Sequence, residues 1–174
     1  LLDPEQLVAD AAEARRLGAE LVIVSLHWGN EGQHAPTDEQ RRIAGLLTGS
    51  GQVDLIVGHH AHVVQPIEQI NGVWVIFGLG NVLSNMPTGT FPASSQDGMV
   101  VTVAVHRDAE GRFRWLRPAV TPTWVDRDDG WRVITLADAL ADPALGPGRR
   151  SVLEASMART RAVVGGFVDG GTQP

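Results

Sequence analysis

Two short apolar runs constrain the fold of this chain more than any other feature. Residues 21–26 and 53–57 are rich in Val, Ile and Leu, as in strands that are covered on both faces. Between them, Thr37 and Gln40 form a capping box that predicts a helix through residue 47. A strand, a connecting helix and a second strand are typical of a parallel sheet in an α/β fold. We therefore expect a parallel first half in which both strands end at the same edge of the sheet.

An antiparallel pattern follows residue 62. Asn71-Gly72 is a strong two-residue turn signal that predicts a hairpin of residues 64–70 and 73–79. Further strands are expected at residues 98–107, 112–116, 123–125 and 131–136, helices at residues 4–17, 136–141 and 151–164, and a long loop at residues 84–97. We thus expect one domain over residues 1–135 and a helical extension and tail over residues 136–174, frayed from residue 165.

Composition narrows the possible functions. The 174 residues carry a net charge of -6 without a basic block, so we expect no binding to nucleic acid through its phosphates. The chain has no Cys, which excludes disulfides and thiolate metal sites but leaves the compartment open. No run reaches the ~18 apolar residues of a membrane span, and we expect a soluble chain with the cytoplasm as the favoured location. The chain opens on Leu1 rather than Met, so we expect it to be a piece of a longer protein.

The second apolar run ends in a cluster of histidines. Three of the six histidines of the chain lie in Gly58-His59-His60-Ala61-His62. Imidazole is the commonest protein ligand for transition metals, and ligands bind at the carboxyl ends of strands in open α/β sheets. Loop histidines can also be purely structural, but we favour a metal-binding or catalytic role for this segment. We expect no such role for His34 and His106.

The first apolar run ends in a histidine as well. Because neighbouring strands lie ~5 Å apart, His27 can converge with the histidine cluster. Glu31, in the same loop, could bind a metal, act as an acid or base, orient an imidazole, or be a solvated carboxylate. Trp28 either walls a cleft or fills the core, and Asn81 either contacts a ligand or caps a turn. We take substrate binding as the hypothesis for Trp28 and Asn81.

Together these segments resemble the CapA family, the bacterial poly-γ-glutamate capsule synthesis proteins, within the calcineurin-like metallophosphoesterase superfamily. The matching stretches are IVSLHWGNE at residues 23–31, DLIVGHHAHVVQPIE at residues 54–68 and VIFGLGN at residues 75–81. The resemblance covers about residues 4–82. It implies the C-terminal half of a four-layer α/β/β/α metallophosphoesterase-like sandwich.

The same resemblance implies a metal site. It implies His27, His60 and His62 as ligands of divalent metal, with two ions of Mn, Fe or Zn. His59 and Glu31 would then be catalytic, His59 as an acid or base beside the ligands. The other ligands of the superfamily come from earlier motifs, which do not occur before His27. A complete site would therefore need an N-terminal half as a partner, from the same polypeptide or another chain.

Three functions follow from this interpretation. The first is a metal-dependent enzyme on a peptide-like or polyglutamate-type substrate, with hydrolysis as the default chemistry. The second is a metal-dependent epimerase or isomerase of a peptide substrate, in which the metal acidifies a C–H bond. The third is a non-catalytic subunit for capsule assembly or binding, which the incomplete ligand set of the chain favours.

Overall fold

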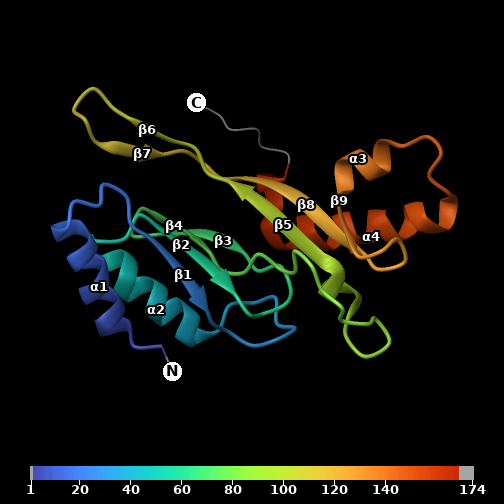
Figure 1. Cartoon of the computed structure of the whole chain (residues 1–174), viewed down its shortest axis with the longest axis horizontal. Coiled ribbons are helices and arrows are strands. Elements are labelled where there is room, and N and C mark those ends of the chain that lie inside the picture. Colours follow the sequence, from blue (N-terminus) through green and yellow to red (C-terminus); the bar gives the residue numbers. More distant parts are fainter. Residues whose placement is uncertain (1, 169–174) are drawn as a thin grey trace. The chain divides into compact units, whose positions relative to one another are not determined.

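Residues 2–168 are described in the computed structural model of the chain, and they form two compact units, which divide between Leu79 and Gly80. The first unit is built on a four-stranded sheet with the order β1-β2-β4-β3. Its elements are α1 (Pro4–Arg16), β1 (Ile23–His27), α2 (Asp38–Gly49), β2 (Leu55–His59), β3 (Ile67–Ile70) and β4 (Val73–Ile76). Strands β1, β2 and β4 are parallel, and β3 is antiparallel to β4 (Figure 1). The predicted parallel first half is confirmed.

Both helices of this unit begin at the caps expected from the sequence. The Asp3 carboxylate accepts hydrogen bonds from the first turn of α1, and Thr37 and Gln40 form the capping box of α2. The two helices contact each other, and their apolar faces pack on the sheet. Ala11, Ile43, Ala44 and Leu47 from the helices share one buried cluster with Leu26, Ile56 and Val75 from the strands. This packing fixes the strand ends on which the site is built.

The hairpin of this unit turns at Asn71-Gly72. Both residues have positive φ, 50° and 82°, as expected of a two-residue turn of this sequence. The predicted hairpin is confirmed, but its strands are shorter than expected. Beyond the strands, residues 64–66 and 77–79 remain paired through an isolated bridge between Val64 and Leu79 and through two backbone hydrogen bonds, from Gln65 to Gly78 and from Phe77 to Pro66.

The second unit is antiparallel, as predicted. One sheet has the order β5-β8-β9, and a separate hairpin joins β6 to β7. Its elements are η1 (Ala93–Gln96), β5 (Asp97–Thr102), β6 (Val105–Arg107), β7 (Phe113–Trp115), β8 (Ala119–Asp126), β9 (Arg132–Thr135), α3 (Leu136–Ala141), α4 (Pro147–Val164) and η2 (Gly165–Phe167). The single strand expected at residues 98–107 is wrong, because it divides into β5 and β6. Helix α4 begins four residues earlier than expected because Pro147 occupies its first turn.

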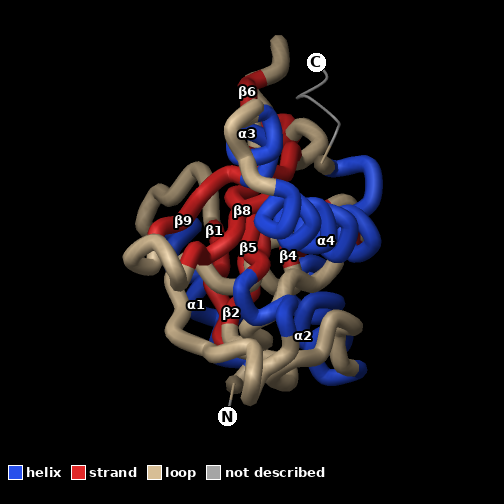
Figure 2. The backbone as a smooth tube through the Cα atoms, turned by 90° about the vertical axis from the view of Figure 1, so that its right-hand side faces the viewer, coloured by secondary structure: helices blue, strands red, loops and turns tan. Residues whose placement is uncertain are grey.

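The two C-terminal helices pack within this unit. Helix α4 contacts β5 and β8, as Figure 2 shows. Leu136 of α3 and Leu153 and Met157 of α4 form a buried cluster with Trp124 of β8. The division between compact units therefore falls at residues 79 and 80, whereas the sequence predicted a boundary at residue 135. The tail predicted to fray from residue 165 instead begins with η2 (Gly165–Phe167), and its remaining part, residues 169–174, lies outside the described residues.

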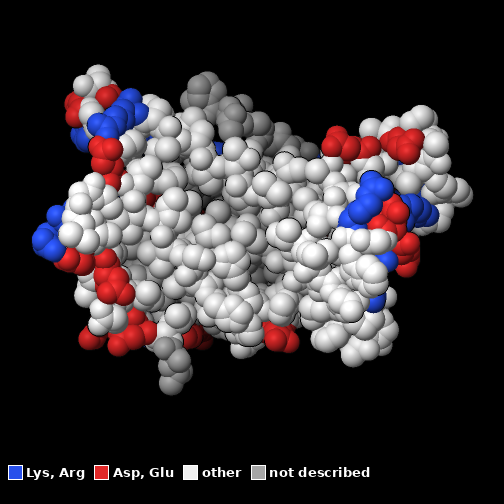
Figure 3. Space-filling model, in the orientation of Figure 1, with Lys and Arg blue, Asp and Glu red and all other residues white. Residues whose placement is uncertain are grey.

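The β6–β7 hairpin carries charges of both signs. Red and blue side chains alternate there at the upper left of Figure 3. The Asp108 carboxylate accepts hydrogen bonds from Arg112 and Arg114, and Arg112 also pairs with Glu110. Arg112 and Arg114 are thus paired with local acids, and Arg107 lies over the ring of Phe113.

Candidate metal centre

Strands β1 and β2 bring the histidine segments to one edge of the first sheet. They pair in parallel with His27 opposite His59, so both strands end side by side. The backbone N–H of Trp28 donates to the carbonyl of His59 at 3.2 Å, which carries the pairing one residue past β1. The loops that follow β1 and β2 therefore begin at the same place.

The loop after β2 has an unusual backbone. His60 has φ of 92° and His62 has φ of 57°, in a region that residues with a side chain seldom adopt. Such conformations cost roughly 1–3 kcal/mol each and collect at functional sites. The fold holds both histidines in these conformations, and this directs their side chains toward the loop after β1.

Side chains from the two loops meet in one cluster. The ring centroids of His27 and His60 lie 4.3 Å apart with a 39° tilt, and those of His60 and His62 lie 6.2 Å apart. Glu31, His60 and His62 each offer one ligand atom, and these atoms all lie within 4.8 Å of one another. We call Glu31, His60 and His62 the ligand triad.

The ligand triad fits a divalent transition metal by its donor chemistry. Two imidazoles and one carboxylate match the ligand types of zinc hydrolases and of non-haem iron sites, which leave other positions open. Glu31 is exposed and both histidines are half-buried, so a further ligand can approach from solvent. The group supplies protein ligands for one ion. His27 is not among its members, although its ring lies against that of His60.

The other predicted site residues differ in their surroundings. Trp28 is buried, and its indole N–H donates to the carbonyl of Phe77 at 2.9 Å, as expected of a core residue. It also lines a cavity of about 210 Å³ together with His27. His59 ends β2 as an exposed residue. Asn81 belongs to the second unit, where its buried amide donates to the carbonyl of Ser95 at 2.7 Å. Substrate contact by Trp28 and Asn81 stays a prediction.

A family model described as bacterial capsule synthesis protein PGA_cap matches residues 2–86, a segment that contains the whole cluster. The chain belongs to the CapA family through this segment. It is 35% identical over 111 residues to the PGA biosynthesis protein CapA of Bacillus subtilis, an alignment that covers 64% of this chain and 28% of that protein. It is 34% identical over 74 residues to the capsule biosynthesis protein CapA of Bacillus anthracis, covering 42% of this chain and 18% of that protein.

A more distant relative extends further along the chain. The probable polyglutamine synthesis accessory protein MT0602 of Mycobacterium tuberculosis is 27% identical over 169 residues, covering 80% of this chain and 44% of that protein. The chain spans less than half the length of each of these three relatives. Across the described residues, no helix of this CapA-family chain combines the length and apolar character needed to cross a membrane.

Sequence reasoning missed the polar residues that hold the CapA-family site together. His34, for which no role was expected, places its Nδ1 atom 2.7 Å from the carbonyl oxygen of Val64. Gln40 and Gln65 are buried and hydrogen-bonded to each other at 2.9 Å. The periodicity of apolar residues predicts which apolar side chains are buried. It gives no signal for a buried amide whose hydrogen-bond partner lies far away in the sequence.

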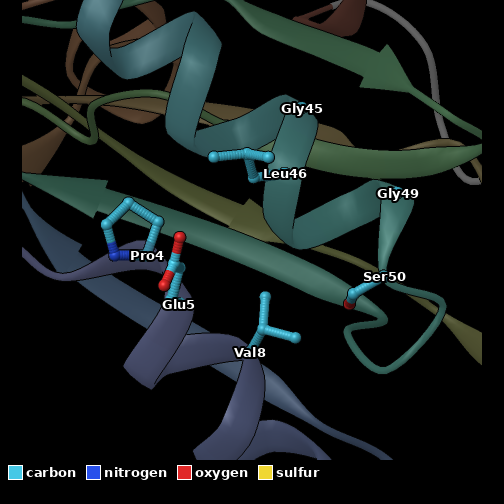
Figure 4. A pocket seen from close by; sticks show the side chains of 7 residues that line it. All are labelled: Pro4, Glu5, Val8, Gly45, Leu46, Gly49 and Ser50. Atoms are coloured by element: carbon cyan, nitrogen blue, oxygen red, sulfur yellow. The ribbon is translucent and has the colours of Figure 1, made fainter.

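A larger cavity of the first unit lies away from the histidines. It has a volume of about 520 Å³ and lies between α1 and α2, lined by Pro4, Glu5, Val8, Gly45, Leu46, Gly49 and Ser50. Figure 4 shows these side chains, of which Glu5 alone carries a charge. This lining contains no group of possible metal ligands or of acid and base residues. The candidate ligands of this unit lie instead at the ends of β1 and β2.

Proposed function

We propose that this CapA-family chain binds a divalent transition metal and takes part in the hydrolysis of a peptide-like or polyglutamate-type polymer during capsule biosynthesis. The observation that carries the proposal is the ligand triad, in which Glu31, His60 and His62 come within 4.8 Å of one another from two different loops. The ring of His27 beside His60 adds a fourth candidate ligand. Mn, Fe and Zn all suit this donor set.

The residues of the chain have separate tasks in this proposal. The triad holds the ion, and its exposure leaves room for a substrate carbonyl and a water molecule. When bound, the ion lowers the pKa of water and polarises the carbonyl oxygen of the substrate. His59, exposed at the end of β2 and opposite His27, is the proposed group that donates a proton to the leaving nitrogen.

The proposed substrate class follows from the relatives. Two of them carry names that refer to capsule or PGA biosynthesis, and a third is named as a polyglutamine synthesis accessory protein. A polyglutamate chain presents repeated amide bonds with free carboxylates. An exposed site at the end of a sheet suits a polymer better than a closed pocket does. The rest of the four-layer sandwich, and a second ion, would come from the parts of the protein outside this chain.

Metal binding is the first test. Titration calorimetry of the metal-free chain with Mn²⁺ or Zn²⁺ should give one ion per chain. His60→Ala and His62→Ala should each abolish binding, whereas His106→Ala should leave binding unchanged because His106 lies exposed on β6. A chain that binds neither metal, or that binds them equally well after both site substitutions, would refute the proposal.

The second test concerns the reaction. The metal-loaded protein should convert poly-γ-glutamate into shorter chains that mass spectrometry resolves, and chelation should stop the conversion. Hydrolysis adds one water per cleaved bond, so fragments in ¹⁸O-labelled water carry the label. If the polymer instead keeps its length and takes up deuterium from D₂O, the enzyme is an epimerase and hydrolysis is wrong.

A further inference from the structure

Two buried glutamine side chains join the loops that carry the ligand triad. Gln65 and Gln40 are 0% and 1% exposed, respectively. Gln65 follows the histidine segment in the loop after β2, and Gln40 lies in the first turn of α2. A buried amide needs partners for its donor and for its acceptor, because an unpaired polar group in the interior costs roughly 1–3 kcal/mol. Both glutamines find these partners in the chain.

The hydrogen bonds run in one direction from α2 to the Glu31 loop. The backbone N–H of Thr37 donates to Oε1 of Gln40 at 2.9 Å, and Nε2 of Gln40 donates to Oε1 of Gln65 at 2.9 Å. Nε2 of Gln65 then donates to the carbonyl of Gln33 at 2.9 Å. Each amide thus uses its oxygen and its nitrogen, and the chain of bonds ends on the turn that contains Glu31.

Two glycines make room for the glutamines. A Cβ atom at Gly29 would lie 2.7 Å from Oε1 of Gln40, and one at Gly78 would lie 3.0 Å from Cγ of Gln65. Gly29 also has φ of 85°, which disfavours any side chain. The backbone around both amides is therefore shaped to receive them.

The turn that carries Glu31 is held to the histidine loop from both sides. On one side, the backbone N–H of Gly32 donates to the carbonyl of Ala61 at 2.7 Å, and Ala61 lies between the two triad histidines in the sequence. On the other side, the side-chain amide of Gln65 donates to the carbonyl of Gln33. Glu31 itself is exposed, so packing against the core does not fix its position. Instead, the hydrogen bonds of Gly32 and Gln33 fix the position of the turn that carries Glu31.

We propose that Gln65, supported by Gln40, is a positioning residue that holds the Glu31 carboxylate beside His60 and His62. The inference rests on the proposed metal site and adds a role for residues that are not ligands. Groups behind the ligands of a metal site typically change metal affinity or activity by ~10–100-fold when they are replaced. Gln65 acts here through the backbone of the Glu31 turn and does not touch the ion.

The test compares metal affinity in a double-mutant cycle. Gln65→Met keeps the length of the side chain but removes both hydrogen bonds, and it should weaken Mn²⁺ or Zn²⁺ binding by ~10–100-fold. In a Glu31→Ala background the same substitution should cause no further loss, because the carboxylate that it positions is gone. Equal losses in both backgrounds, or no loss in either, would overturn the inference.

A measurement without metal separates the inference from the proposed function. Amide hydrogen exchange of metal-free protein should be faster at Gly32 in Gln65→Met than in wild type, and unchanged in α1. Unchanged exchange at Gly32 would overturn the inference whether or not metal binds. If wild type binds no ion, the proposed function fails, and faster exchange at Gly32 still supports the attachment of the turn.

Two further variants complete the experiment. Gln40→Met removes the hydrogen bond that supports Gln65 but leaves the bond from Gln65 to Gln33, so it should change metal affinity and Gly32 exchange in the same direction as Gln65→Met and by a smaller factor. It tests the inference if Gln65→Met does not fold. Thr48→Val is the matched control, because Thr48 is a buried polar residue that donates to the carbonyl of Ala44 at the far end of α2. It should leave metal affinity and Gly32 exchange unchanged, and a loss of affinity as large as that of Gln65→Met would show a general effect of stability.

Discussion

The indole N–H of Trp28 donates to the carbonyl of Phe77 at 2.9 Å, and the two rings stack with centroids 5.6 Å apart. Trp28 follows β1 and Phe77 follows β4, yet β2 lies between these strands in the sheet. The bond passes over Gly58, where a Cβ atom would lie 1.8 Å from the Phe77 oxygen and 2.3 Å from the Trp28 Nε1 atom. The close approach requires glycine at the position just before the histidines.

Gly58→Ala should therefore destabilise the first unit severely. The new methyl group would displace both partners of a buried hydrogen bond and force the end of β2 away from its neighbours. Overpacking and loss of the bond together should lower the free energy of unfolding by roughly 3 kcal/mol or more. Urea denaturation followed by Trp fluorescence measures this loss, and a loss below about 1 kcal/mol would contradict the close approach.

Gly45→Ala is the matched control for this substitution. Gly45 lies inside α2, and a Cβ atom there would meet nothing within 4 Å. Alanine should increase the free energy of unfolding by about 0.5–1 kcal/mol, because glycine is the poorer residue in a helix interior. The same change from Gly to Ala should thus have opposite signs at the two positions.

A buried ion pair holds α4 on the second sheet. Asp97 begins β5 with its side chain 2% exposed, and Arg159 donates to both of its carboxylate oxygens at 2.7 and 2.8 Å. Ser156 donates to the same carboxylate at 2.6 Å. Arg159→Leu leaves this carboxylate buried without its cation and should cost about 3 kcal/mol, since one-sided removal of a buried pair is strongly destabilising.

An exposed pair in the same unit provides the comparison. Arg132 and Asp129 lie 2.8 Å apart, but both side chains are more than half exposed. Arg132→Leu should change the free energy of unfolding by less than about 1 kcal/mol. Urea denaturation of both variants distinguishes the two sites, and equal losses would mean that the Asp97 carboxylate is stabilised by groups other than Arg159.

The sequence predicted the edge of the sheet where the histidines meet because local signals determine it. Apolar runs, a capping box and an Asn-Gly turn each act over a few residues, and parallel pairing then places His27 and the cluster side by side. These rules depend on no distant contact. The metal-binding role of the cluster stays a prediction.

Other features depended on tertiary contacts that no local pattern encodes. The boundary at residue 79 arises because α3 and α4 pack on β8, so the C-terminal helices share a core with the strands before them. The buried pairing of Gln40 with Gln65 joins two segments that look polar in the sequence and therefore exposed. Likewise, residues 84–97 read as a loop, yet Ser95 and Asp97 are buried.

The β6–β7 hairpin should lose order at acidic pH. Partial burial raises the pKa of the Asp108 carboxyl, but hydrogen bonds from the Arg112 backbone and the Arg114 and Arg112 guanidiniums outweigh it and lower the pKa below 3.8. A depressed pKa stabilises the folded form above the unfolded pKa, and this contribution is lost as the pH falls through the folded value. Amide shifts of Glu110 and Arg112 should therefore be constant near pH 5 and change below about 3.8.

Asp108→Asn tests the origin of that transition. The amide cannot titrate, so the acid-induced change at Glu110 and Arg112 should disappear, and exchange at both amides should be faster at neutral pH. The helices of the second unit should show the same shifts in both proteins. An unaltered acid transition in the variant would assign it to another carboxyl group.

The strained backbone of His60 predicts that glycine is more stable than alanine at this position. With φ at 92°, any residue with a Cβ atom is strained there, whereas glycine adopts this conformation readily. His60→Gly should unfold with a free energy roughly 1–2 kcal/mol above that of His60→Ala, and both should lose metal binding. At His59, in the extended backbone of β2, the order should reverse, with alanine about 0.5–1 kcal/mol better than glycine. Denaturation of the four variants measures both differences. If alanine is also the better residue at position 60, the strain is absent and the loop reaches its conformation without an energetic cost.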